Sequence, residues 1–116
     1  LQERYHKMLS DLPVTLPHQS KDSYSALHLY PIQIDLDRVS KTHSQVFDEL
    51  RDNGLGVNLH YIPVHMQPYY QNMGFKMGNF PNAENYFRRA ISIPLFYDMT
   101  FEQQDEVVRI LQEALK

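Results

Sequence analysis

Apolar residues recur at helical spacing from the first residue of the chain. Their positions fit i, i+4, i+7, i+8 and i+11, which places them on one face of a helix: Leu1, Tyr5, Met8, Leu9 and Leu12. Pro13 and Pro17 then predict a loop. Because the pattern is already established at residue 1, with no capping residue before it, we expect the chain to be part of a longer protein. The alternative is a naturally short protein.

Two later helices carry start signals. Thr42 with Gln45, and Thr100 with Gln103, have the T-x-x-Q spacing of a capping box, in which each side chain bonds the backbone of the other residue. Asn53-Gly54 predicts the end of the first of these helices, since glycine accepts the left-handed conformation that follows a helix. The predicted buried positions are Val46, Phe47 and Leu50 in the first helix and Val107, Ile110, Leu111 and Ala114 in the second.

Three segments rich in β-branched and aromatic residues are typical of strands: 24–36, 56–62 and 91–95. Pro31 removes one backbone donor from the first segment, which predicts an edge or a bulge there. Alternation along the second segment predicts that Asn58, His60 and Ile62 face one way and Val57, Leu59 and Tyr61 the other.

A further helix is predicted after a loop. Residues 66–80 hold Pro68, Gly74 and Gly78, which indicate a short helical turn followed by a loop. Pro81 suits the first turn of a helix, and the positions that share its apolar face are Ala83, Tyr86, Phe87 and Ala90. Together the elements predict an α+β fold: a small, largely antiparallel sheet of about three strands, packed on one face by about four helices.

The composition narrows the class of protein. The chain has 116 residues, of which 42% are hydrophobic, enough for one domain with a modest core. The 11 basic and 14 acidic residues are intermixed and give a net charge of −3, which argues against a surface for nucleic acid or for an anionic membrane. There is no cysteine, so neither a disulfide nor a thiolate metal site is expected. No apolar run approaches the roughly 20 residues of a membrane span, and a cytoplasmic location is the simplest expectation.

The segment 56–75 is polar and aromatic, yet it carries no acidic residue, lysine or arginine. Uncharged donors such as His60 and His65, beside flat apolar rings, suit sugars and nucleotide bases. Pro63 and Pro68 would keep the segment rigid. The alternative, which composition alone favours, is packing in the core or at an inter-domain face by Tyr61, Tyr69 and Tyr70.

Neither a metal site nor a catalytic nucleophile is predicted. His60 and His65 are five residues apart across Pro63, and no acidic residue lies between Asp52 and Glu84. Each histidine taken alone is better explained as a hydrogen-bonded, partly buried residue. The chain also lacks a G-x-S-x-G motif and a glycine-rich phosphate loop.

Four landmarks follow one another along the chain. They are His28-Leu29-Tyr30, the run His60-Tyr61-x-Pro63-x-His65-x-x-Pro68, Phe80-Pro81 with Ala83-Glu84, and Ser92-Ile93-Pro94-Leu95 leading to Thr100. In this order and spacing they resemble the C-terminal part of the DegT/DnrJ/StrS family, pyridoxal-phosphate-dependent aminotransferases that act on nucleotide-linked keto sugars. The resemblance covers essentially the whole chain. Within the family it is strongest to the aminotransferase of the pseudaminic acid pathway.

The resemblance implies that residues 1–116 are the small, C-terminal domain of a fold-type I aminotransferase whose large domain is absent. That domain would supply the Schiff-base lysine and the groups that hold pyridoxal phosphate. The chain's own lysines lie in contexts unlike the family's lysine loop: Lys7, Lys21, Lys41, Lys76 and Lys116. We therefore expect no catalytic and no cofactor-binding residue in the chain, which would be inactive alone. The parent enzyme would aminate a UDP-linked 4-keto-6-deoxy sugar with L-glutamate as donor, and would be a homodimer.

Carried over residue by residue, the family pattern implies substrate-binding roles for four residues of the uncharged segment. His60 and Tyr61 would approach the nucleotide-sugar at the subunit interface, and His65 and Tyr69 would line the sugar or diphosphate side. Two alternatives remain. One is a stand-alone module that binds sugar-nucleotides without catalysis; the other is a dimerisation domain in which this segment packs against its twin.

Overall fold

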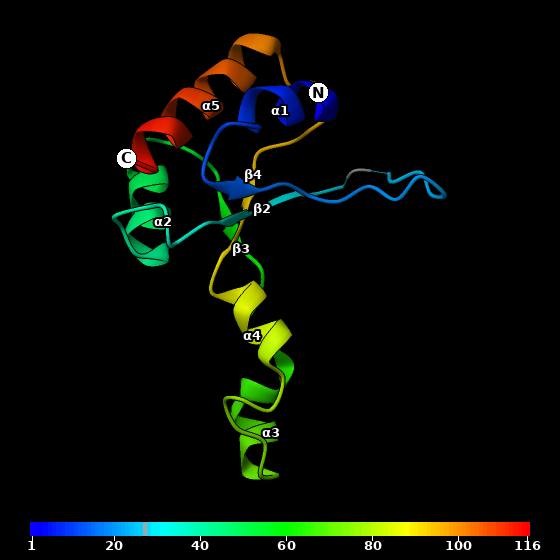
Figure 1. Cartoon of the computed structure of the whole chain (residues 1–116), viewed down its shortest axis with the longest axis vertical. Helices are drawn as coiled ribbons and strands as arrows, with labels where there is room; N and C mark the ends of the chain where they lie inside the picture. The colour runs from blue at the N-terminus through cyan, green and yellow to red at the C-terminus, as the bar shows by residue number, and fades with distance from the viewer. Residues whose placement is uncertain (27) are drawn as a thin grey trace.

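Four short strands form one antiparallel sheet in the order β1-β2-β4-β3 (Figure 1). The computed structural model describes residues 1–26 and 28–116. In chain order the elements are α1 (Gln2–Leu9), β1 (Val14–Thr15), β2 (Tyr30–Ile34), α2 (His43–Asp52), β3 (Asn58–Leu59), the 3-10 turn η1 (Val64–Met66), α3 (Pro68–Asn72), α4 (Pro81–Phe87), β4 (Ala90–Ile93) and α5 (Phe101–Ala114). The predicted α+β class is therefore confirmed.

The register of the sheet separates its two faces. Ile32 of β2 lies opposite Ile91 of β4, and both side chains join the core. Pro31 lies opposite Ser92 and, one position along the strand, projects to the other face. Asn58 of β3 is also paired with Ser92. Because directly opposed residues share a face, the polar positions of β3 and β4 gather on the side away from the core.

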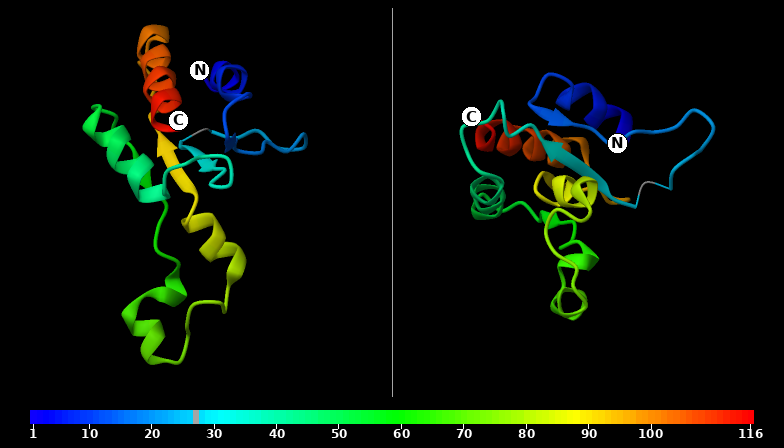
Figure 2. Two further views of the ribbon diagram at one scale, coloured as in Figure 1. Left: turned by 60° about the vertical axis from the view of Figure 1, so that its left-hand side comes forward. Right: turned by 60° about the horizontal axis from the view of Figure 1, so that its bottom comes forward.

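Three helices cover the core face of the sheet. Their buried side chains are Tyr5 and Leu9 from α1, Val46 and Leu50 from α2, and Val107, Val108, Ile110, Leu111 and Ala114 from α5. Figure 2 shows these helices grouped on one side of the molecule. Burying each large aliphatic side chain contributes about 1.5–3 kcal/mol, so this cluster is the main source of stability.

Both predicted capping boxes are present. The Thr42 hydroxyl accepts the backbone N–H of Gln45 at 3.3 Å, and the Gln45 side chain accepts that of Thr42 at 2.8 Å. Thr100 and Gln103 make the same pair of bonds at 3.2 and 2.9 Å. After α2, Gly54 has a φ of 84°, which confirms the predicted helix end.

The strands are shorter than predicted, because each extends only where a partner strand is available. The predicted segments 24–36 and 56–62 form strands only over Tyr30–Ile34 and Asn58–Leu59, and the segment 91–95 corresponds to β4, which begins one residue earlier and ends at Ile93. Residue 27 of the first segment lies outside the described residues. A fourth strand, β1, was not predicted. It pairs Val14 with Ile34 and Thr15 with Gln33, and a strand of two residues has no periodicity that a sequence pattern can reveal.

The predicted number of about four helices agrees with the five observed, but α3 and α4 contribute no side chain to the hydrophobic core of the described residues. They belong to a protruding arm (residues 60–89) that runs out from β3 and returns to β4 (Figures 1 and 2). The predicted apolar face of α4 is confirmed only in part: Ala90 is buried and Phe87 half-buried, whereas Ala83 and Tyr86 are exposed. Glu84, which was not predicted to face inward, is buried. The inward face of α4 meets hydrogen-bond donors of the arm rather than the apolar core.

Candidate functional site

The arm holds all four residues that the sequence analysis assigns to substrate binding. It extends away from the three core helices in Figure 1 and in the left view of Figure 2, and the molecule measures 48 × 37 × 24 Å. Its large exposed apolar side chains include Tyr61, Ile62, Val64, Tyr69, Met73 and Met77. Such a concentration is typical of a surface that a ligand or another protein covers.

His65 lies in the interior of the arm. Its side chain is 7% exposed, and Nε2 lies 2.8 Å from Oε1 of Glu84, which is 4% exposed. The His65 ring packs against Phe80, with 4.8 Å between ring centroids. His65 therefore ties η1 to α4 across 19 positions of sequence.

Glu84 receives three further hydrogen bonds. The backbone N–H of Gly78 donates to both carboxylate oxygens, at 2.8 and 2.9 Å, and that of Phe80 to one of them at 3.3 Å. Burial alone raises the pKa of the Glu84 carboxyl, but the bonds from His65, Gly78 and Phe80 outweigh this effect and hold the pKa below its ordinary value. The carboxylate is therefore ionised at neutral pH. An ionised carboxylate only accepts hydrogen bonds, so Nε2 of His65 carries a proton.

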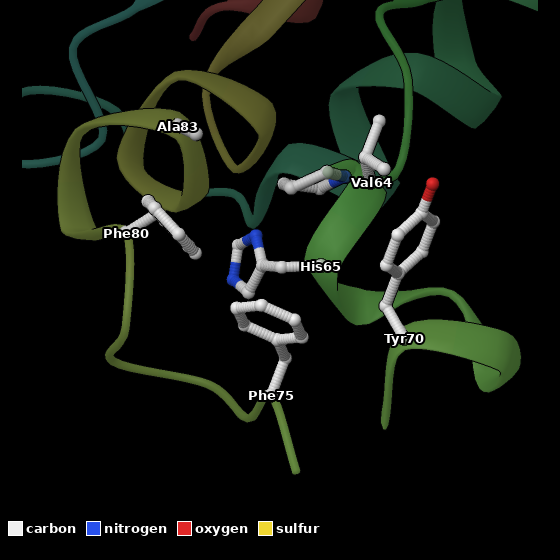
Figure 3. A pocket seen from close by; sticks show the side chains of 7 residues that line it. Val64, His65, Tyr70, Phe75, Phe80 and Ala83 are labelled. Carbon is white, nitrogen blue, oxygen red and sulfur yellow. The ribbon is translucent and has the colours of Figure 1, made fainter. Parts of the chain in front are cut away.

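An apolar hollow of about 390 Å³ opens beside His65 (Figure 3). Its lining residues are Pro63, Val64, His65, Tyr70, Phe75, Phe80 and Ala83. In Figure 3 the rings of Phe75 and Phe80 lie beside the His65 imidazole, and Tyr70 projects from α3 toward Val64. The hollow therefore suits a largely uncharged group that offers a small number of hydrogen bonds.

His60 lies at the base of the arm, on the face of the sheet that turns away from the core. Its Nε2 is hydrogen-bonded to the hydroxyl of Ser92, a buried residue of β4. Ser92 is paired with Asn58, and alternation along the strand returns His60 to the same face two residues later. The His60 ring also meets that of Tyr61 edge-on, with centroids 5.2 Å apart.

Tyr61 and Tyr69 are the most exposed of the four predicted residues, at 78% and 71%. Tyr69 contacts the ring of Tyr70 edge-on at 5.3 Å. The structure thus brings His60 together with Tyr61, whereas Tyr69 and His65 each meet aromatic rings farther along the arm. Neither tyrosine packs in the core of this chain.

Sequence reasoning missed Glu84 and Ser92. Glu84 is the first acidic residue after Asp52 and the only one in the arm. A buried histidine of the arm could therefore pair with no other carboxylate of that segment, and this sequence feature could have predicted the pair. Ser92 is a polar residue within an apolar strand. Its register with Asn58, which only the paired sheet defines, was needed to connect it to His60.

Two further properties concern residues 1–26 and 28–116. In this range no three side chains of His, Asp or Glu lie close enough together to hold a metal ion. No helix of the described part is both long and apolar enough to cross a membrane.

Known proteins match this chain along nearly its whole length. Spore coat polysaccharide biosynthesis protein SpsC of Bacillus subtilis is 35% identical over 116 residues, covering 97% of the chain and 30% of SpsC. The structure of the putative sugar aminotransferase Spr1654 from Streptococcus pneumoniae, in its PMP form, superposes with a TM-score of 0.86 at 25% identity, over 97% of this chain and 28% of that one.

A third structure, that of Helicobacter pylori PseC, an aminotransferase involved in the biosynthesis of pseudoaminic acid, shares the fold. Its TM-score is 0.85 at 22% identity, over 98% of this chain and 30% of PseC. The chain thus spans less than a third of the length of these relatives. The sequence profile of the DegT/DnrJ/EryC1/StrS aminotransferases matches residues 1–112, and the chain therefore belongs to this aminotransferase family.

Proposed function

We propose that the chain is the small, C-terminal domain of a pyridoxal-phosphate-dependent sugar aminotransferase, and that its arm lines the substrate site. A large domain outside this chain would hold the cofactor. Membership of the family supports the reaction class. The chain's share of its relatives, 30% or less, supports its role as one domain of a larger enzyme. By itself the chain would be inactive.

The observation that carries the proposal is the exposure of Tyr61 and Tyr69 on an arm whose leading segment is uncharged. A tyrosine ring offers a sugar or a nucleotide base an apolar face, and its hydroxyl offers a hydrogen bond. His60, held by Ser92, adds a polar group beside Tyr61. These side chains bind a ligand without having to desolvate a fixed charge of their own.

The described residues do not fit a complete site for pyridoxal phosphate. None of the chain's lysines is buried. The Nζ atom of Lys41 is engaged by the Glu49 carboxylate at 2.6 Å and the Ala114 carbonyl at 3.1 Å. The hollow beside His65 is lined by no lysine or arginine that could hold the phosphate. Cofactor binding would therefore depend on residues outside this chain.

For the parent enzyme we infer a UDP-linked 4-keto-6-deoxy sugar as amino acceptor, L-glutamate as donor and a cytoplasmic location. These assignments, and a role in the pseudaminic acid pathway, rest on the sequence landmarks, to which the likeness to PseC adds the fold alone. A homodimer is supported by the exposed apolar side chains of Met73 and Met77, which a second subunit would cover.

Substitutions in the full-length enzyme test the binding roles. His60→Ala and Tyr61→Phe each remove one hydrogen-bonding group, so KM for the nucleotide-sugar should rise about five- to tenfold. The half-reaction with L-glutamate should keep its rate, since the donor does not contact these residues in the proposal. Tyr97→Phe is the matched control, because Tyr97 is 97% exposed and follows the opposite end of β4 from the arm. Equal losses in both half-reactions would contradict the assignment.

The alternatives predict different behaviour. A stand-alone binding module would be encoded from close to Leu1, without a lysine-containing domain upstream, whereas the proposal requires a long coding sequence before it. Transamination by the 116-residue chain, supplied with pyridoxal phosphate, L-glutamate and a keto-sugar nucleotide, would overturn the claim that the chain is inactive alone.

A further inference from the structure

His65 has one ring nitrogen without a partner. Its Nε2 is bonded to Glu84, whereas Nδ1 makes no hydrogen bond within residues 1–26 and 28–116. Every fully enclosed side-chain nitrogen and oxygen of the described residues has a hydrogen-bond partner. Nδ1 is therefore reachable from outside, although the side chain is only 7% exposed. Because His65 lines the apolar hollow, Nδ1 is the ring atom available to a ligand seated there.

We propose that Glu84 is a positioning residue that holds His65 as its Nε2–H tautomer and thereby presents Nδ1 as a hydrogen-bond acceptor in the hollow. The ligand group would be a hydroxyl or N–H donor of the nucleotide-sugar, so this inference rests on the proposed function. Glu84 acts through His65 and does not itself touch the ligand. Its role is to select the tautomer of the His65 ring.

The geometry around Glu84 leaves the imidazole little freedom. The carboxylate is fixed by the backbone N–H groups of Gly78 and Phe80, which belong to the loop that leads into α4. The Phe80 ring packs against the imidazole and restricts its rotation. A carboxylate bonded to one ring nitrogen determines which nitrogen of a histidine keeps a lone pair. Here the free lone pair belongs to Nδ1.

The lining of the hollow indicates the chemistry of its ligand. Pro63, Val64, Phe75, Phe80 and Ala83 supply apolar surface, and Tyr70 is the one other ionisable side chain of the lining. With no lysine or arginine there, the hollow offers no partner for a phosphate. It suits an uncharged part of the substrate, such as a sugar ring or a base, that donates one hydrogen bond to Nδ1.

The tautomer is measured directly by 15N NMR of histidine-labelled full-length enzyme at pH 8. His65 is assigned by the signals lost in His65→Gln. The expected result is a protonated Nε2 and an unprotonated Nδ1. Glu84→Gln should abolish this preference, because an amide both donates and accepts. A wild-type ring with its proton on Nδ1, or on both nitrogens, would overturn the proposal, and this reading needs no substitution at Glu84.

Kinetics test the ligand contact. In Glu84→Gln, KM for the nucleotide-sugar should rise about tenfold, with kcat for the L-glutamate half-reaction unchanged. Glu102→Gln, at an exposed position of α5, is the matched control. An unchanged KM with the expected wild-type tautomer would overturn the ligand contact. A wild-type enzyme that does not use nucleotide-sugars would instead overturn the proposed function, while the NMR result still decides the tautomer.

Discussion

The hydrogen bond between Ser92 and His60 links the buried strand β4 to a predicted substrate-binding residue, so Ser92→Ala tests whether that residue needs the support of the sheet. The Ser92 side chain is buried in β4, and its hydroxyl is bonded to Nε2 of His60. Loss of a neutral hydrogen bond costs about 0.5–1.5 kcal/mol. His60 is only partly buried, so its Nε2 can turn to water once the serine is gone, and we expect about 1 kcal/mol. If His60 contacts the nucleotide-sugar, that loss corresponds to about a fivefold lower affinity for it.

The assay is a double-mutant cycle in the full-length enzyme. KM for the nucleotide-sugar is measured for Ser92→Ala, for His60→Ala and for the double variant. Since the serine acts through the histidine, the effect of Ser92→Ala should vanish once His60 is alanine, which gives a coupling energy of about 1 kcal/mol. Ser44→Ala, at an exposed position of α2, is the control. Additive effects of the two substitutions would refute the reasoning, because Ser92 would then act independently of His60.

Three further predictions concern the stability of the chain, measured by urea unfolding. Leu50→Ala leaves a cavity at a fully buried position of α2 and should lower the free energy of unfolding by about 2–5 kcal/mol. Leu59→Ala, at a 37% exposed position, should lower it much less. Similar losses in the two variants would contradict the described core. Thr100→Ala removes the cap of α5 and should cost about 1 kcal/mol, and an unchanged midpoint would show that the capping box does not contribute. Burial raises the pKa of Tyr30 from 10.0 to about 12 in the folded chain. Because the unfolded chain loses the Tyr30 proton at a lower pH than the folded chain, the free energy of unfolding should fall as the pH rises from about 10 to about 12, by up to about 3 kcal/mol. Tyr30→Phe should reduce that loss, leaving the part due to Tyr5, whose pKa burial also raises; an identical alkaline slope in the variant would refute the linkage.

Local features of the fold could be predicted from the sequence because each depends on neighbouring residues. The capping boxes at Thr42 and Thr100 need only a partner three positions away, and Gly54 ends α2 through its own backbone freedom. The apolar rows of α1, α2 and α5 likewise depend on one helical period. The strand β1 could not be predicted in this way, since its two residues form a strand only because β2 lies beside them.

The candidate site divides in the same way. The uncharged aromatic segment, its prolines and its family landmarks are properties of the linear chain, so His60, Tyr61, His65 and Tyr69 could be selected without a structure; their binding roles stay predictions. Only the tertiary structure placed Glu84 against His65 and Ser92 against His60, across 19 and 32 positions of sequence. Those pairings depend on the path by which the arm leaves β3 and returns to β4. No local sequence preference encodes that path, because it depends on hydrogen bonds between buried polar groups that are far apart in the sequence.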